Sequence, residues 1–273
     1  EKIMYLLFDI GATKTRIALS KDRETLHDAV IFDTDQNFEK GMQNIFNAVK
    51  RLTRESITGI AGGVTGTLAR DKQVLTRSPN LSGWVEKEID RAFEDEFKCP
   101  AFIENDAAIV GLGEAVAGAG MGKSIVMYVT VSTGVGGVRI VDGEIDEHSL
   151  GFEPGNSIID MEHTLEELVS GSALEERFGK KAHEIPQDDF VWEELAEKLA
   201  YGLHNSMVHW SPDVIVLGGG MIVGDPAIPV LRIEKYLKDI SKTYPMCPPV
   251  KKAQLGTVGG LHGALHYLKS RMD

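Results

Sequence analysis

The sequence predicts an α/β fold built from two similar lobes. An apolar strand, a turn of small residues and an alternating strand open the chain as "MYLLFDIGATKTRIALS", and the same order returns as "IVMYVTVSTGVGGVRIV". In both halves helical patterns come after these strands. Because a unit that is used twice indicates a duplicated architecture, we expect two lobes with a cleft between them. Ligands of α/β proteins favour such clefts, at the carboxyl ends of strands.

The first half combines strands with amphipathic helices. Residues rich in β-branched and apolar side chains, bounded by turn residues, predict strands at 3–10, 16–20, 29–34, 57–64 and 99–105. Apolar residues at helical spacing predict helices at 38–52 and 84–97, and a helix of small residues follows at 106–120.

At Ser124 the strand–turn–strand pattern restarts in "SIVMYVTVSTGVGGVRIVDGEI", and a further buried strand lies in "DVIVLGGGM". Helices are expected at 189–210, 228–241 and 260–270, with a short strand at 252–255. The expected lobes are residues 1–115, joined by the C-terminal helix 259–273, and residues 116–258.

The composition is that of an ordinary globular protein. The chain has 273 residues, of which 42% are hydrophobic and 26% charged. No apolar stretch approaches the length of a membrane span, and the first residues lack the pattern of an export signal. Cys99 and Cys247 form no CxxC pair, so we expect free thiols and a cytoplasmic location.

The net charge of −12 is spread along the chain. A nucleic-acid surface needs a stripe of basic residues, so we expect no nucleic-acid partner. Because no apolar stretch is long enough to span a membrane, we expect no membrane partner either. A phosphate ligand would have to be held by local groups such as backbone N–H groups, a lysine or a metal ion.

The first turn has the composition of a phosphate-binding turn. Gly11 and Ala12 permit close approach to the backbone, Thr13 offers a hydroxyl and Lys14 a positive charge. Asp9, at the end of the preceding strand, is a candidate magnesium ligand through water. A plain β-hairpin explains the same residues equally well.

Two further glycine turns support a phosphate or nucleotide site. Thr133 and Gly134 lie in the turn that repeats the first one, so the pair of turns would clamp a polyphosphate chain. Gly219 and Gly220 follow a buried strand, where a flat group can lie against the backbone; a simple strand-to-helix turn is the alternative.

The segment "ENDA" places Asn105 and Asp106 where a strand meets a helix. An aspartate at this point can accept the proton of a substrate hydroxyl, as in kinases that phosphorylate an alcohol. From spacing alone, the role of a helix N-cap suits either residue better.

Read together, these segments resemble the ROK family of sugar kinases, which belongs to the actin/hexokinase/Hsp70 (ribonuclease H-like) fold group. The similarity runs from about residue 7 to about residue 264. It rests on "DIGATKTRIAL", "GVTGTL", "SPNLSGW", "ENDAAIVGLGEA", "VSTGVGGVRIVDGEI", "LEELVSGSALEERFG", "PDVIVLGGGM" and "LGTVGGLHGA".

The resemblance implies transfer of the γ-phosphoryl group of ATP, with magnesium, to a hexose hydroxyl such as C6 of glucose. Asp106 would be the general base, and a homodimer is implied. ATP phosphates and nucleoside would contact Asp9, Gly11, Ala12, Thr13, Lys14, Thr133, Gly134, Gly219 and Gly220. The sugar would contact Asn80, Asn105, Asp106, Glu153, Asn156 and Glu166.

The sequence departs from the family pattern at two places. Ala12 replaces the usual second glycine of the first turn. In "GFEPGNSIIDMEHTLEELVSG", Asn156 replaces a zinc-binding histidine, and the family's cysteine module is absent. Because His163 alone cannot complete a tetrahedral site, we expect no zinc and interpret His163 as a surface residue that precedes a helix.

Other functions remain open at this point. The substrate of a kinase could instead be fructose or an N-acetylated amino sugar, and the phosphoryl donor could be polyphosphate. A catalytically silent sugar-binding homologue is a further alternative, because fold does not determine activity. A transcriptional regulator is disfavoured, because no basic helix-turn-helix precedes the first strand.

Overall fold

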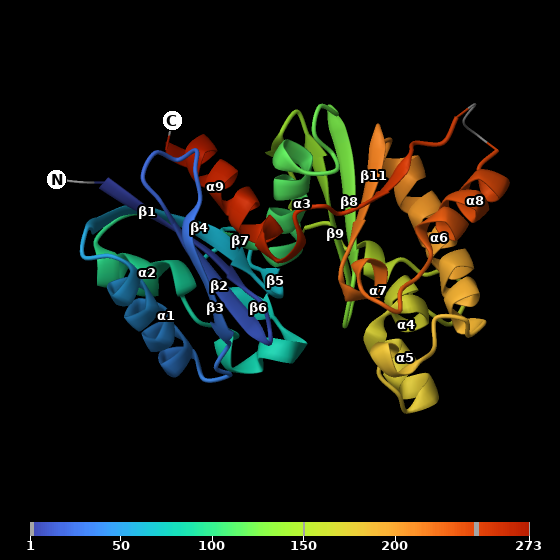
Figure 1. Ribbon diagram of the computed structural model, residues 1–273, viewed down its shortest axis with the longest axis horizontal. Helices are drawn as coiled ribbons and strands as arrows, with labels where there is room; N and C mark the ends of the chain where they lie inside the picture. The colour runs from blue at the N-terminus through green and yellow to red at the C-terminus, as the bar shows by residue number, and fades with distance from the viewer. Residues whose placement is uncertain (1–2, 150, 243–245, 273) are drawn as a thin grey trace. The chain divides into compact units, whose positions relative to one another are not determined.

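The computed structural model describes residues 3–149, 151–242 and 246–272 (Figure 1). The chain divides into two compact units. Unit 1 comprises Glu1–Ala117, Glu147–Gly151 and Leu255–Asp273, and unit 2 comprises Gly118–Asp146 and Phe152–Gln254. The sequence-based domain bounds stay a prediction; they did not include 147–151 in unit 1.

Unit 1 is organised around a five-stranded sheet. Its order is β3 (His27–Asp33), β2 (Lys14–Ser20), β1 (Ile3–Ile10), β4 (Ser56–Val64) and β7 (Ala101–Asn105). β2 runs antiparallel to both β1 and β3, whereas β1, β4 and β7 are parallel to one another. A small hairpin, β5 (Thr67–Leu68) and β6 (Leu75–Arg77), follows β4.

Helices cover both faces of this sheet. Alternate residues of β1, from Met4 to Ile10, join the core with α1 (Phe38–Leu52) and α2 (Ile89–Phe97). On the opposite face lie α3 (Asp106–Ala117) and α9 (Gly259–Met272), as Figure 1 shows.

The backbones of α3 and α9 touch. A Cβ added at Gly113 would lie 2.3 Å from the carbonyl oxygen of Gly259, and one at Gly263 would lie 1.8 Å from that of Ile109. Only glycine fits these contacts, because any side chain would force the two helices apart.

Unit 2 repeats the sheet of unit 1. Its order is β10 (Glu144–Ile145), β9 (Val135–Val141), β8 (Ile125–Val131), β11 (Val214–Gly218) and β12 (Val250–Lys252). The three antiparallel strands and the two parallel additions match those of unit 1, which confirms the duplicated unit.

The core of unit 2 packs β8 and β11 against α6 (Val191–Trp210) and α8 (Val230–Ile240). The described part of this unit also contains the short α-helices α4 (Leu165–Val169), α5 (Gly171–Phe178) and α7 (Gly220–Val223).

The helix expected at 84–97 begins at Ile89 instead. Residues Pro79–Trp84 form a 3-10 segment whose Trp84 is fully buried and donates its indole N–H to the carbonyl of Asp35 at 3.0 Å. Glu86 has a φ of 63° and donates its N–H to Leu75, so tertiary pairing replaces the first helical turn. Among the described residues no helix is long and apolar enough to cross a membrane.

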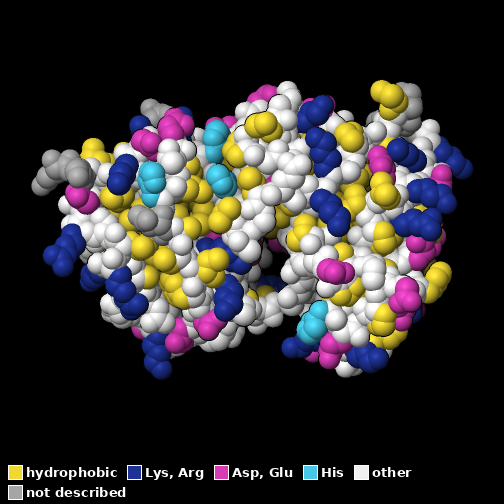
Figure 2. Space-filling model, in the orientation of Figure 1, with side chains coloured by type: hydrophobic (Ala, Val, Ile, Leu, Met, Phe, Trp, Pro, Cys, Tyr) yellow, Lys and Arg dark blue, Asp and Glu magenta, His cyan; other side chains and the backbone are white. Residues whose placement is uncertain are grey.

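Lys and Arg side chains are interspersed with Asp and Glu on the face drawn in Figure 2. This mixed distribution agrees with the spread of charge along the sequence.

Candidate active site

Two carboxyl groups in unit 1 lie at the carboxyl ends of parallel strands. Asp9 is paired in register with Gly63 of β4, and Gly63 is paired with Glu104 of β7, two residues before Asp106. A Cβ on Gly63 would lie only 2.9 Å from the Cα of Asp106. The glycine therefore lets α3 begin close against the end of β4, and it brings Asp106 to the same edge as Asp9.

Asp9 is almost completely buried, with 7% of its surface exposed. Burial, and then the nearby charge of Asp106, raise its pKa to about 7, although the Arg16 guanidinium acts in the opposite direction. Nη1 of Arg16 lies 3.4 Å from Oδ2 of Asp9. A Cβ on Gly260, in the first turn of α9, would lie 2.8 Å from the Asp9 Cγ, so that turn closes over the carboxyl group.

Asn105 and Asp106 make different hydrogen bonds. The side chain of Asn105 accepts the N–H of Ala108 at 3.1 Å, which is the N-cap bond of α3, and donates to the carbonyl of Gly66 at 2.9 Å. Asp106 Oδ1 accepts the N–H of Ala107 at 2.9 Å, and the Thr65 hydroxyl also bonds this carboxyl. Since Asn105 supplies the cap, Asp106 is left for other chemistry.

Burial raises the pKa of Asp106 above that of an ordinary aspartate, although part of its surface remains accessible. The hydrogen bonds from Thr65 and Ala107 oppose that rise. A raised pKa makes a carboxylate a better proton acceptor.

The first glycine turn is a tight hairpin between β1 and β2. The N–H of Gly11 donates to the carbonyl of Lys14 at 3.0 Å. The carbonyls of Gly11 and Ala12 accept hydrogen bonds from the Thr34 hydroxyl at 2.8 Å and the Gln36 amide at 3.0 Å. These bonds fix the turn against the segment after β3, with its carbonyl groups already satisfied.

Two side chains of this turn, Ala12 and Lys14, have ordinary surroundings. No residue from 11 to 14 has a positive φ, so Ala12 adopts a backbone that suits alanine. The ammonium group of Lys14 is half-exposed and lies 2.5 Å from Asp33 Oδ1, so its role toward phosphate stays a prediction.

The second glycine turn, in unit 2, is held by two helices. The N–H groups of Gly171 and Ser172, which begin α5, donate to the carbonyls of Ser132 and Thr133 at 2.7 and 3.2 Å. Glu166 of α4 accepts the N–H of Val135 at 2.7 Å. A Cβ on Gly134 would lie 2.5 Å from Glu166 Oε2, so a side chain at this position would have to displace the carboxylate that covers the turn.

A cavity of about 420 Å³ opens beside this turn in unit 2. Its wall combines the turn with α5, the segment after it and α7. The lining residues are Ser132, Thr133, Gly171, Ser172, Glu175, Lys181, Ala182, His183, Gly220, Met221, Gly224, Asp225 and Pro226. The cavity thus brings together Thr133 and Gly220, which lie far apart in the sequence.

The two predicted nucleoside glycines differ in their surroundings. Gly219 has a φ of 84°, and a Cβ on it would lie 2.2 Å from the carbonyl of Val131. A Cβ on Gly220 would meet no atom within 4 Å, so the free side of this glycine belongs to the cavity.

The predicted sugar contacts lie in both units. In unit 1, Asn80 is exposed on the 3-10 segment Pro79–Trp84. In unit 2, Asn156 donates to Glu153 Oε2 at 3.2 Å across the 3-10 turn Pro154–Asn156, and Glu166 is exposed on α4. Their contact with a sugar stays a prediction.

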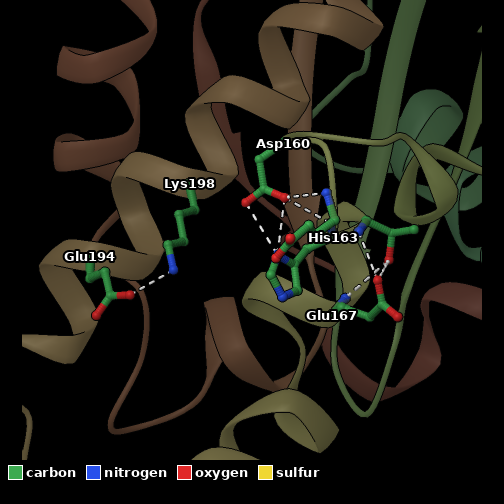
Figure 3. Close-up of polar contacts among 7 residues, drawn as sticks. Asp160, His163, Glu167, Glu194 and Lys198 are labelled. Atoms are coloured by element: carbon green, nitrogen blue, oxygen red, sulfur yellow. Dashed lines mark hydrogen bonds and ion pairs between the residues drawn. The ribbon is translucent and has the colours of Figure 1, made fainter.

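The segment that replaces the family's cysteine module is closed by hydrogen bonds (Figure 3). Asp160 Oδ1 accepts the N–H of His163 at 2.8 Å and lies 3.0 Å from its Nδ1. Thr164 and Glu167 form a capping box that starts α4. His163 is exposed and precedes this helix. The described residues contain no group of three His, Cys, Asp or Glu side chains that could hold a metal; the expected lack of zinc remains a prediction.

A family model described as the ROK family matches residues 5–271. The chain belongs to the ROK family. A putative fructokinase of Bacillus subtilis is 27% identical over 235 residues, covering 78% of this chain and 76% of that protein. A fructokinase of Streptococcus mutans is 25% identical, covering 94% and 96%.

Among solved structures, a ROK hexokinase from Thermus thermophilus is 25% identical to this ROK protein, with a TM-score of 0.81. The match covers 98% of this chain and 99% of that one. The α/β class and the actin/hexokinase-like two-domain fold predicted from the sequence are thereby confirmed.

Sequence reasoning missed several side chains of this ROK protein. Thr65 bonds the carboxyl of Asp106, and Glu175, Lys181 and His183 line the cavity. Glu175 lies within the quoted segment "LEELVSGSALEERFG", which was a usable signal. Nothing in the local pattern marks Lys181 or His183, because their place in the cavity wall depends on the packing of distant elements.

Proposed function

We propose that this ROK protein is an ATP-dependent sugar kinase that phosphorylates a hexose hydroxyl, with Asp106 as general base. The observation that carries the proposal is the pair of carboxyl groups, Asp9 and Asp106, at one glycine-lined strand edge. Their surroundings differ: Arg16 lies beside Asp9, whereas Asp106 accepts bonds from Thr65 and Ala107. Different surroundings suit different roles for two neighbouring acids.

Asp106 would take the proton of the attacking hydroxyl. The oxygen of that hydroxyl would form a bond to the γ-phosphorus of ATP while the bond from phosphorus to the β–γ bridging oxygen breaks, and ADP leaves. Anchoring of Oδ1 by the Ala107 N–H fixes the carboxyl, so that its position favours in-line attack. The raised pKa strengthens its basicity.

Asp9 suits a role near magnesium. A buried carboxylate beside a second carboxylate is unfavourable in its charged form, and a nearby cation would offset this cost. Asp9 would therefore hold Mg²⁺ through water, and the ion would neutralise phosphate charge when bound. In unit 1, the turn from Gly11 to Lys14 would contact phosphate.

In unit 2, Thr133 and Gly134 would contact phosphate and the cavity would accept the nucleoside. Its volume of about 420 Å³ is in the range of small-ligand pockets, and Gly220 leaves one wall open to a flat base. Gly219 would act by shaping this wall.

The sugar would contact Asn80, Asn105, Glu153 and Glu166, with Asn156 as an added contact that offers both a donor and an acceptor. Glucose, fructose and N-acetylated amino sugars are the substrates to compare, since relatives named fructokinase and hexokinase both match. Transfer to the C6 hydroxyl of glucose is the first expectation.

The test is a coupled assay of ADP release over these sugars, with ATP or polyphosphate as donor. Asp106→Asn should lower kcat by about a thousandfold or more and leave the affinity for ATP within about threefold, because base catalysis and positioning are lost but the nucleotide pocket is not. Asp95→Asn, at an exposed acid of α2 in the same unit, is the control. Sugar binding without turnover by the unmodified protein would favour the catalytically silent homologue, and near-normal turnover by Asp106→Asn would exclude the assigned base.

A further inference from the structure

The hairpin between β4 and the 3-10 segment has an unusual attachment in unit 1. Lys72, at its tip, forms an ion pair with Glu104, the residue before Asn105 on β7. The Glu104 side chain is only 3% exposed, and Lys72 is 30% exposed. Lys72 also adopts a φ of 60°, which side-chain-bearing residues rarely do. A positive φ is common in hairpin turns, but an ion pair to a buried carboxylate is not needed at a solvent-exposed tip.

Both oxygens of the Glu104 carboxylate are used. Oε2 accepts from the Lys72 ammonium group, and Oε1 accepts the N–H of Asn105 at 2.9 Å. The ammonium nitrogen also lies 6.0 Å from the centre of the buried Tyr267 ring of α9. The hairpin tip is therefore tied to the strand that ends at Asn105 and to α9, which packs on the neighbouring strand β4.

The base of the hairpin is tied to the same edge. The Asn105 amide donates to the carbonyl of Gly66 at 2.9 Å, and the hydroxyl of Ser78 donates to the carbonyl of Thr65 at 2.8 Å. The chain then enters the 3-10 segment that carries Asn80. Residues 66–78 thus connect Thr65, which bonds the Asp106 carboxyl, to a candidate sugar contact.

We propose that Lys72 is a positioning residue for the sugar: its ion pair with Glu104 holds hairpin 66–78 against the end of β7 and so fixes the segment that runs to Asn80 relative to Asp106. This inference rests on the proposed kinase function. A buried carboxylate whose partner is removed is strongly unfavourable, so the pair is a costly connection for a surface hairpin unless its geometry matters.

The first test is Lys72→Met, measured by steady-state kinetics and by hydrogen exchange. The KM for the best sugar should rise at least tenfold while the KM for ATP stays within twofold. Backbone amides of 66–78 should exchange at least tenfold faster, and those of α1 should not change. Lys72→Arg retains the charge, so its sugar KM and its amide exchange in 66–78 should stay close to those of the unmodified protein. The control Lys50→Met removes another ion pair of unit 1, which joins Lys50 to Glu96 at 2.6 Å. It should change neither the sugar KM nor the exchange of 66–78.

The double variant Lys72→Met/Glu104→Gln separates positioning from stability. It removes the unpaired buried charge, so thermal stability should recover while sugar KM and hairpin exchange stay altered. Recovery of all three together would overturn the positioning role, as would faster exchange with an unchanged sugar KM. Unchanged exchange in Lys72→Met would overturn the attachment itself, and this measurement holds even if the protein phosphorylates no sugar.

Discussion

Asp9→Asn should stabilise the unliganded protein at alkaline pH. The Asp9 carboxyl is buried, and burial together with the Asp106 charge raises its pKa from 3.8 to about 7. A group with a raised pKa binds its proton more tightly in the folded state. Its contribution to stability is therefore present below pH 4 and is lost as the pH rises toward 7.

The size of the effect follows from the shift. Each pKa unit corresponds to about 1.4 kcal/mol, so ionisation of Asp9 costs the folded state about 4 kcal/mol at pH 8 at most. Part of this cost depends on the charge of Asp106, and asparagine keeps the volume but not every hydrogen bond. We therefore expect Asp9→Asn to be about 2 kcal/mol more stable than the unmodified protein at pH 8, and close to it at pH 4.5.

The assay is urea unfolding of both proteins at the two pH values without nucleotide or metal. Asp33→Asn replaces an exposed acid of the same unit and should show little pH-dependent gain. The variant should also lose most kinase activity, since Asp9 is assigned a role near magnesium. If Asp9→Asn is less stable at pH 8, or if its advantage is the same at both pH values, Asp9 does not carry an unfavourable buried charge.

The remaining predictions concern glycine and alanine positions. Gly219→Ala should lower stability by about 1–3 kcal/mol in thermal unfolding, because residue 219 has a positive φ and the added Cβ would meet a carbonyl. Gly220→Ala should keep stability within about 0.5 kcal/mol but raise the KM for ATP several-fold. Equal stability losses in the two variants would contradict the different surroundings assigned to these glycines. Gly63→Ala should lower kcat at least tenfold in the coupled assay by pushing Asp106 away; unchanged turnover would show that the strand edge tolerates a side chain. Ala12→Gly should leave ATP kinetics within twofold and cost about 0.5 kcal/mol, because Ala12 already has an unstrained φ; a marked gain in ATP use would identify Ala12 as a defect.

The spacing of apolar residues along the sequence predicted the helices and strands in which that spacing matches the buried face. The helix over 38–52 was predicted with its observed bounds, and the repeated strand–turn–strand unit predicted both sheets. The predicted start of α2 at Trp84 was wrong. Trp84 fits the helical spacing of apolar residues because it is buried in the core, but it lies in a 3-10 segment before the helix. Tertiary contacts overrode the local pattern there.

The same limit applies to the candidate site. The glycine turns and "ENDA" are visible in the sequence because they are contiguous. Spacing alone could not decide between Asn105 and Asp106 as the N-cap of α3; the hydrogen bond from the Ala108 N–H to Asn105 Oδ1 decides it. The ion pair of Lys72 and Glu104 joins residues 32 positions apart, and no periodicity marks such a pair.

The contact of α3 with α9 has a consequence for the order of folding during synthesis. Most of unit 1 is formed by Glu1–Ala117, but the unit also needs α9, which is translated after unit 2. Until α9 leaves the ribosome, the glycine face of α3 has no partner, and the turn that closes over Asp9 does not exist. Unit 2 can therefore fold while unit 1 waits, and the edge that carries Asp9 and Asp106 is completed only after α9 has been synthesised.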